Sequence, residues 1–260
     1  MIHSMICLPR MSKYATCGRD GTLRIWGARS RRHLRTVDVA APGSPAWVTA
    51  CVDVLSSAPG GGADGAPAGV LAACCTDRSL ALFDTMLFKP LARHPLGDAV
   101  PLCCESYSHR TANRDALDFL VVGDERGRLH FFAVTPAFLR PPPGAPAPRP
   151  AAVLAVHAGA VTACRYVSLS SKGLLVSASA DGTLALVDAA DRSVRYYRGH
   201  EKAVLCFAVC PEPLGYIVSG GQDPDAQVAS PPGPRIRVIP AARRPQATAA
   251  VRLESRYKDR

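Results

Sequence analysis

The residues of this 260-residue chain that are best suited to chemistry are its cysteines and histidines. Two vicinal pairs, Cys74-Cys75 and Cys103-Cys104, raise the question of zinc, because thiolates are preferred zinc ligands. Adjacent residues on a strand point to opposite faces, however, and zinc ligands commonly stand two to four residues apart. We therefore expect no structural zinc site. Reduced, buried thiols are expected for the cysteines inside apolar runs, namely Cys17, Cys51, Cys74, Cys164 and Cys206.

No motif in the sequence indicates catalysis. A Gly-x-Ser-x-Gly elbow, a phosphate-binding loop and a two-histidine metal motif are all absent from the sequence, and Gly60-Gly61-Gly62 is not followed by Lys-Ser or Lys-Thr. The sequence therefore predicts a protein that is not an enzyme and that carries neither cofactor nor metal. The histidines are scattered at His3, His33, His94, His109, His130, His157 and His200.

Composition and charge bear on whether the protein spans a membrane, is secreted or binds nucleic acid. The longest apolar runs, such as Val70–Cys75, are far shorter than a membrane span, and the amino terminus shows no secretory signal, so we expect a cytoplasmic protein without a membrane span. A formal net charge of +10 permits nucleic-acid binding. The arginines are scattered, and the densest group, residues 29–33, lacks interleaved aromatic residues. A solvated basic face is the favoured interpretation.

One unit recurs along the chain. Its clearest copy is Tyr14 to Trp26, in which a short apolar strand, an Asp-Gly turn and an alternating strand follow one another. Asp-Gly supports the positive φ angles of a tight hairpin turn. Further copies span residues 70–83, 117–132 and 174–187, and a fifth begins at Tyr216 and resumes at Arg235 after a Pro-rich insertion. Apolar segments before and between these hairpins supply two more strands per unit, which predicts an all-β fold.

At this point the residues resemble a known family. Asp20 to Trp26, Ser177 to Leu184, and Gly199-His200 with Val204 four residues after the histidine are similar to WD-repeat signatures. The resemblance implies a WD-repeat β-propeller of about five four-stranded blades. It also implies a buried network of a histidine, a Ser or Thr, a turn Asp and a Trp, although Trp26 is the only tryptophan at a strand end. The network residues by position are Thr16, Asp20, Trp26, Asp77, His157, Ser177, Asp181, His200, Ser219 and Asp223.

The blades are expected at about 1–39, 46–94, 99–156, 160–198 and 203–240. Residues 58–69 and 136–150 are rich in Pro, Gly and Ala and are expected to be flexible surface loops, and residues 241–260 a basic tail. Because the sequence begins inside a blade and shows no visible partner that closes the ring, although residues 249–253 could supply one strand, we expect an incomplete ring.

The predicted function is a non-catalytic scaffold that binds other proteins through loops at one end of the blades. Candidate contact residues there are Arg19, Arg78, Arg126 and Lys202. Segments at 47–51, 73–78, 101–104 and 199–207 also resemble the proteins that combine EF-hands with WD repeats, several of which are linked to cilia, which suggests a ciliary or cytoskeletal assembly. Two alternatives stay open: a nucleic-acid-binding propeller that uses the basic surface, and a truncated fragment without independent function.

Overall fold

The strands are short and regularly spaced. A computed structural model describes residues 1–40, 44–54, 69–110, 116–169, 172–210, 216–223, 226–229 and 236–239. The first half contains β1 (Ile2–Leu8), β2 (Lys13–Gly18), β3 (Thr22–Gly27), β4 (His33–Asp38), β5 (Val48–Val54), β6 (Val70–Cys75), β7 (Ser79–Asp84), β8 (Pro90–Pro95), β9 (Pro101–Arg110) and β10 (Ala116–Asp124), with a 3₁₀ turn at Pro9–Met11. The second half contains β11 (Arg128–Ala133), α1 (Pro136–Leu139), β12 (Ala152–Ala155), β13 (Val161–Leu169), β14 (Lys172–Ser179), β15 (Thr183–Asp188), β16 (Val194–Arg198), β17 (Val204–Cys210), β18 (Tyr216–Gly221), β19 (Ala226–Ala229) and β20 (Ile236–Ile239).

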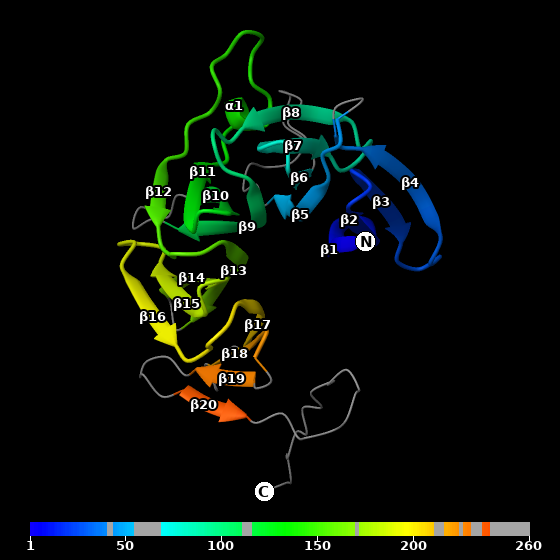
Figure 1. Cartoon of the computed structure of the whole chain (residues 1–260). Coiled ribbons are helices and arrows are strands. Elements are labelled where there is room, and N and C mark those ends of the chain that lie inside the picture. The colour runs from blue at the N-terminus through cyan, green and yellow to red at the C-terminus, as the bar shows by residue number, and fades with distance from the viewer. Residues whose placement is uncertain are drawn as a thin grey trace, which may run out of the picture.

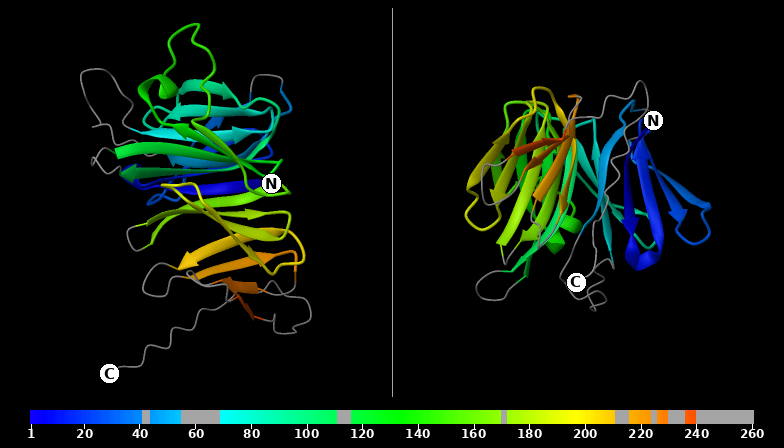
Figure 2. Two further views of the ribbon diagram at one scale, coloured as in Figure 1. Left: turned by 90° about the vertical axis from the view of Figure 1, so that its left-hand side faces the viewer. Right: turned by 90° about the horizontal axis from the view of Figure 1, so that it is seen from below.

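Successive groups of four strands form five antiparallel sheets over the described residues, which we number blades 1 to 5. The blades follow one another around an arc that is open between blade 1 and the described part of blade 5, with β1, β5, β9, β13 and β17 on its inner side (Figure 1). Seen from the side, the blades stack face to face (Figure 2). The fold is therefore an open β-propeller arc, as the sequence predicts.

The same irregularity marks every inner strand. The pairing of the first and second strands shifts by one residue near the start of each blade, as between Ile2 and Ser4 in blade 1 and between Val161 and Ala163 in blade 4. Because this bulge recurs at one place, positions can be matched between blades without ambiguity. Thr16 opposite Met5, for example, is equivalent to Ser177 opposite Cys164.

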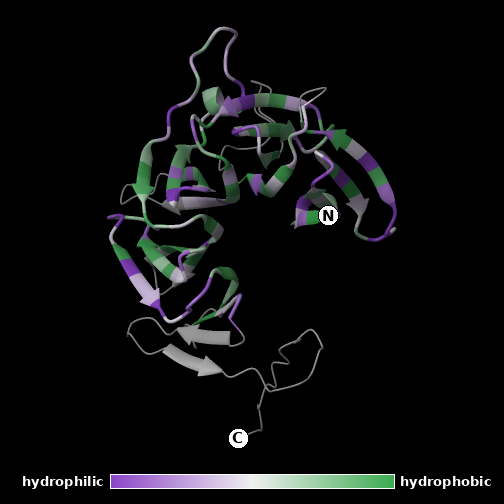
Figure 3. Cartoon of the chain, in the orientation of Figure 1, coloured by the Kyte–Doolittle hydropathy of each residue, from purple (hydrophilic) through white to green (hydrophobic). Residues whose placement is uncertain are grey.

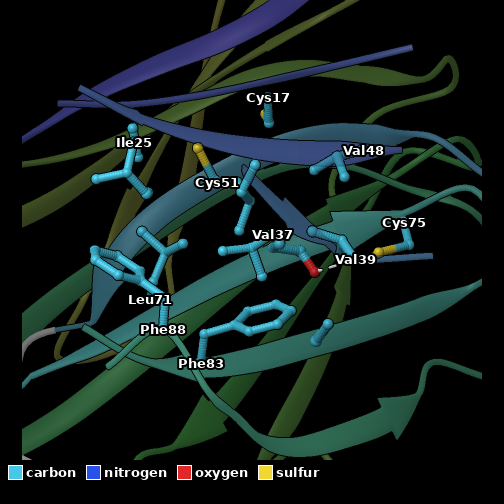
Figure 4. Close-up of a cluster of buried hydrophobic side chains, with 14 of the residues drawn as sticks. Cys17, Ile25, Val37, Val39, Val48, Cys51, Leu71, Cys75, Phe83 and Phe88 are labelled. Carbon is cyan, nitrogen blue, oxygen red and sulfur yellow. Dashed lines mark hydrogen bonds between the residues drawn. The ribbon is translucent and has the colours of Figure 1, made fainter. Parts of the chain in front are cut away.

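The hydrophobic core lies between the blades. Four clusters of buried side chains fill the four interfaces between consecutive blades. In the first, Ile25 and Val37 of blade 1 pack near Leu71 and Phe83 of blade 2 (Figure 4). Strands of the middle blades are covered on both faces, so β6 is buried at every position, whereas hydrophilic and hydrophobic residues alternate along the outer strand β4 (Figure 3).

This stacking explains the vicinal cysteines. Cys75 belongs to the cluster between blades 1 and 2, while Cys74 belongs to the cluster between blades 2 and 3. Cys103 and Cys104 likewise belong to different clusters. The two thiols of each pair therefore point in opposite directions, as expected for adjacent residues on a strand.

Three expectations need correction. Cys206, which was expected to be a buried thiol, is exposed on β17, the inner strand of the last described blade. The Pro-rich segment 136–150 was expected to be a flexible loop, but it begins with the short helix α1, whose Phe138 and Leu139 are buried against blades 2 and 3. Thr135 caps this helix, and its hydroxyl accepts a hydrogen bond from the Phe138 amide at 3.1 Å. Phe138 and Leu139 anchor the start of this segment in the core, which its Pro-rich composition does not indicate.

The fifth hairpin also differs from the prediction. Its third strand is β19 and not the segment that resumes at Arg235, because Ala229 pairs with Ile217 as Val187 pairs with Leu175. Residues 236–239 form the fourth strand. The predicted loop at 58–69 falls almost entirely outside the described residues, and the tail at 241–260 does so completely. Within the described part of the chain, no helix is long and apolar enough to cross a membrane.

Candidate functional site

The tight turns between the second and third strands of all blades lie on the same face of the arc. In each blade the turn between the second and third strands bonds to the segment just ahead of the inner strand, as between the Thr76 amide and the Trp47 carbonyl at 3.0 Å. Equivalent bonds join Arg19 to Met1 and Ala180 to Ala160. We call this face the turn face. It is formed by these turns and by the segments that lead into the inner strands.

The turns take the conformation that their sequences predict. Gly21, Gly127 and Gly182 adopt φ angles of 70°, 78° and 83°, respectively. Arg78 stands at the same position of blade 2 with a φ of 63°, a left-handed conformation that is uncommon outside glycine. At Gly127 a Cβ atom would lie only 2.1 Å from the His157 carbonyl oxygen, so this turn requires glycine for space as well.

In blade 4 a buried histidine joins the second strand to the turn. The Nε2 of His157 lies 2.8 Å from the Ser177 hydroxyl and its Nδ1 lies 2.9 Å from the Thr183 hydroxyl. Thr183 in turn donates to Asp181 at 2.7 Å. Asp181 also accepts from the Ala158 amide at 2.8 Å. Both ring nitrogens are therefore satisfied without a tryptophan, and burial lowers the pKa of His157.

Blades 5 and 1 hold variants of this network. In blade 5, His200 lies 2.9 Å from the Ser219 hydroxyl and 2.5 Å from the Asp223 carboxylate. In blade 1, the Trp26 indole donates to the Thr16 hydroxyl at 2.9 Å. Asp20 accepts from the Thr22 amide at 3.3 Å and pairs with the half-exposed Arg24 at 2.8 Å. The positions named from the sequence thus meet within blades 4 and 5. In blade 1 only Thr16 and Trp26 meet, because Asp20 contacts Thr22 and Arg24 instead.

Blade 3 uses residues that the sequence pattern did not single out. Asp124 is almost completely buried and accepts from the Arg128 guanidinium at 2.7 Å and from His130 at 2.9 Å. It also accepts from the amides of Arg126 and Arg128, both at 2.9 Å. Burial opposes ionisation of Asp124, yet these donors lower the pKa of its carboxyl. Asp124 stands two residues before Arg126, which occupies the position of the turn Asp in this blade, and for this reason the repeat pattern missed it.

Blade 2 replaces the histidine with an arginine. Asp77 accepts from the Ser79 hydroxyl at 2.5 Å and pairs with Arg93 at 2.8 Å. The Arg93 guanidinium also donates to the Val39 carbonyl of blade 1, so it links two blades. His94 is buried beside it, and its Nε2 lies 2.7 Å from the Phe138 carbonyl of α1.

The four cations predicted to contact partners are all exposed on the turn face. The Arg19 guanidinium lies 5.4 Å from the ring centroid of Trp47, which is itself 36% exposed. Arg126 forms an ion pair with Asp98 in the segment leading into β9. For Arg78 and Lys202 the described residues offer no ion pair. Trp47 and Asp98 belong to this face although the repeat pattern gave no reason to select them.

The buried thiols do not form a metal centre. In the described part of the chain, no group of three His, Cys, Asp or Glu side chains has the geometry of a metal site. The neighbouring Cys74 thiol and burial raise the pKa of Cys104 well above its usual range. A thiol of this kind is held protonated and is poorly nucleophilic at neutral pH.

Comparison with known proteins supports the class that the fold defines. Residues 3–27 and 148–188 match the family model described as WD domain, G-beta repeat. The first stretch covers β1 to β3, and the second covers β12 to β15. No curated protein matches the chain. The match supports the WD-repeat family, whose domains are generally protein-interaction scaffolds. The narrower likeness to proteins that combine EF-hands with WD repeats has no support from these comparisons.

Proposed function

We propose that this chain is a non-catalytic scaffold that binds other proteins through the turn face. The observation that carries the proposal is that the turn face combines a fixed backbone with exposed cationic and aromatic side chains. Buried polar networks and glycine turns fix the backbone there. The side chains that project from this backbone include an arginine stacked near an exposed tryptophan. Arginine and tryptophan are enriched among the residues that dominate binding energy at protein interfaces.

Charge reversal tests this proposal. One variant carries Arg19→Glu, Arg78→Glu and Lys202→Glu on the turn face. The matched control carries Arg29→Glu, Arg31→Glu and Arg32→Glu, which change the charge equally but lie at the turn between β3 and β4, at the other end of the blade. Proteins captured by the tagged chain from cell extract are quantified for both variants and the parent. We expect true partners to fall at least tenfold with the turn-face variant and to persist with the control.

Equal loss in both variants would point to general electrostatic attraction and would contradict a turn-face site. Binding of single- and double-stranded nucleic acid is measured alongside at increasing salt. A steep fall of affinity with salt would identify the basic surface as a nucleic-acid site instead. A cooperative melt of the purified chain excludes the interpretation as a fragment that does not fold.

We further propose that the scaffold works in the cytoplasm, in a ciliary or cytoskeletal assembly. The support is the resemblance of residues 47–51, 73–78, 101–104 and 199–207 to proteins that combine EF-hands with WD repeats, several of which are linked to cilia. Fluorescent tagging in ciliated cells tests this proposal, with the turn-face variant as the comparison. Accumulation at the axoneme that depends on the turn face is the expected result, and a uniform distribution of both forms would contradict it.

A further inference from the structure

The connection between the third and fourth strands is much longer in blade 3 than in its neighbours. Residues 28–32, 85–89 and 189–193 make this connection in blades 1, 2 and 4, whereas residues 134–151 make it in blade 3. The longer segment projects outward from the arc beyond α1 and β12 (Figure 1). Since three blades connect the same two strands with a short turn, the additional residues are not needed to form the blade.

Both ends of this projecting segment are fixed to the blades. On one side α1 buries Phe138 between blades 2 and 3, and the Phe138 carbonyl oxygen lies 2.7 Å from Nε2 of the buried His94. On the other side the Ala151 amide donates to the Phe131 carbonyl at 2.7 Å, where β12 begins to pair with β11. Between these anchors, residues 140–147 are all exposed. The segment is therefore held at its base and open to solvent beyond it.

A turn at the tip divides the segment into two arms. The Ala145 amide donates to the Pro142 carbonyl at 3.0 Å, and Gly144 between them has a φ of 78°. A Cβ atom on Gly144 would meet no neighbouring atom within 4 Å, so this position of the tip faces open space. The arm after the turn, residues 145–150, has the sequence Ala-Pro-Ala-Pro-Arg-Pro. We call it the proline arm.

The sequence of the proline arm determines its backbone conformation. Each of its residues is either a proline, whose ring sets φ to about −65°, or precedes a proline and is thereby disfavoured in the helical region. An uninterrupted run of such residues favours the polyproline II helix, which has three residues per turn. In that conformation Pro146 and Arg149 stand on one edge, about 9 Å apart. Both are exposed, whereas Pro148 and Pro150 are partly buried. The edge with Pro146 and Arg149 is therefore the one that a partner can contact.

The chemical groups of the proline arm define the partner that can recognise it. Proline has no backbone N–H, so the arm offers apolar rings and carbonyl acceptors but few donors, and it cannot pair with the edge of a sheet. Tryptophan and tyrosine side chains combine an apolar face with a hydrogen-bond donor and complement such a surface. The Arg149 guanidinium forms no ion pair within the described residues, so it is available to a carboxylate of a partner.

We propose that the proline arm is a docking site for a protein domain with a groove lined by aromatic side chains and a carboxylate about 9 Å from the pocket for Pro146. Pro146 packs between the aromatic rings, and Arg149 pairs with the carboxylate. Because both ends of the segment are anchored and the prolines restrict its backbone, little conformational entropy is lost on binding. The arm follows the third strand of blade 3, at the end of the blade opposite the turn face, so this site is separate from the surface proposed above.

The experiment measures binding of the whole chain to a panel of purified SH3, WW and EVH1 domains, which recognise Pro-rich segments through aromatic grooves. Titration calorimetry gives the Kd for each domain. We expect at least one domain to bind with a Kd on the order of 10–100 µM. A capped peptide of residues 144–151 should compete for the same groove but bind several-fold more weakly, because its ends are not anchored. If no domain of the panel binds the parent chain, the segment is a spacer and the proposal is wrong.

Substitution of the prolines tests the mode of recognition. The double variant Pro146→Ala, Pro148→Ala removes two rings and releases the backbone of the proline arm, and it is expected to weaken binding more than about tenfold. Pro141→Ala lies in the arm before the turn and is the matched control, which should change the Kd less than about twofold. All three positions lie outside the strands and helices, and the Tm of each variant verifies that the fold is intact.

Charge reversal tests the ion pair. Arg149→Glu should weaken binding about tenfold, and replacing the facing acidic residue of the bound domain by Lys should restore it. Arg29→Glu, at the corresponding connection of blade 1, changes the net charge equally and should leave the Kd unchanged. Equal losses for these two variants, or full affinity in the folded double proline variant, would overturn the proposal. The turn-face variant with three charge reversals should bind the domain as the parent does, so failure of this site and failure of the turn-face scaffold are distinguishable.

Discussion

Blades 1 and 4 share the same backbone arrangement but differ in the hydrogen bonds that stabilise it. Both have an Asp-Gly-Thr turn, the same bulge and the same pairing register. In blade 4 a buried histidine connects the second strand to the turn. In blade 1 Trp26 of the third strand donates a hydrogen bond to Thr16 of the second strand, and the turn carboxylate of Asp20 pairs with the half-exposed Arg24. The turn geometry is therefore a property of the turn residues, whereas the central network depends on the blade that precedes it.

The difference implies that equivalent polar groups contribute unequally to stability. A group enclosed by two blades loses its hydrogen bonds without water to replace them, whereas a group on the uncovered face of blade 1, which none of the described blades covers, can turn to solvent. Removing equivalent polar contacts from different blades should therefore reveal how completely each blade is enclosed.

The largest effect is expected for His157→Ala. This change removes two ring contacts, leaves the fully buried Ser177 hydroxyl unpaired and opens a cavity between blades 3 and 4. We expect a loss of about 2–4 kcal/mol in the free energy of unfolding, measured by urea titration. His3→Ala, which truncates an exposed histidine of β1, is the control and should change stability little. A loss no larger than that of the control would contradict the enclosed network.

Blade 3 extends the comparison to a carboxylate. Asp124→Asn keeps a carbonyl for the two turn amides but turns an amide group toward Arg128 and His130. We expect a loss of about 2 kcal/mol. Asp98→Asn removes the ion pair of the same arginine on the exposed turn face and should have no measurable effect. Equal losses would show that the surface pair, and not the buried acceptor, holds the turn.

The parts of this architecture that sequence could predict are those set by local chemistry. Asp-Gly turns and alternating strands have local physical causes, so the hairpins around Asp20 and Asp181 were placed correctly. The role of Asp124 could not be read in this way, because its partners His130 and Arg128 do not follow the repeat. The burial of Phe138 depends on a groove formed by blades 2 and 3, which no local pattern describes.

A smaller effect, of opposite sign, is expected for Glu105→Gln on the inner strand of blade 3. Burial raises the pKa of Glu105 to about 7, although the charge of Arg165 opposes this shift. A carboxyl whose pKa is raised on folding stabilises the fold below its unfolded pKa, and this contribution disappears as the pH rises through about 7. The variant should therefore be more stable than the parent by about 1 kcal/mol near pH 8, and the advantage should vanish near pH 5.

Urea titrations at several pH values measure this difference. His157 gives the opposite slope, because its lowered pKa makes the fold lose stability as the pH falls below about 6.5. The double variant with His157→Ala should accordingly show a flatter pH profile than either single variant. A constant advantage of Glu105→Gln across the range would mean that this carboxyl does not titrate differently in the fold.

The smallest effect is expected for Trp26→Phe, the counterpart of His157→Ala on the uncovered face. The change removes one hydrogen bond to Thr16, but none of the described blades covers this side of the sheet, so the freed hydroxyl can bond to water. We expect a loss of about 0.5–1 kcal/mol, measured by the same urea titration. Comparing the losses of unfolding free energy for Trp26→Phe and His157→Ala therefore shows how far each network is shielded from water. If Trp26→Phe costs as much as His157→Ala, the uncovered face of blade 1 is covered in solution, and a second molecule of the chain becomes the first candidate for the cover.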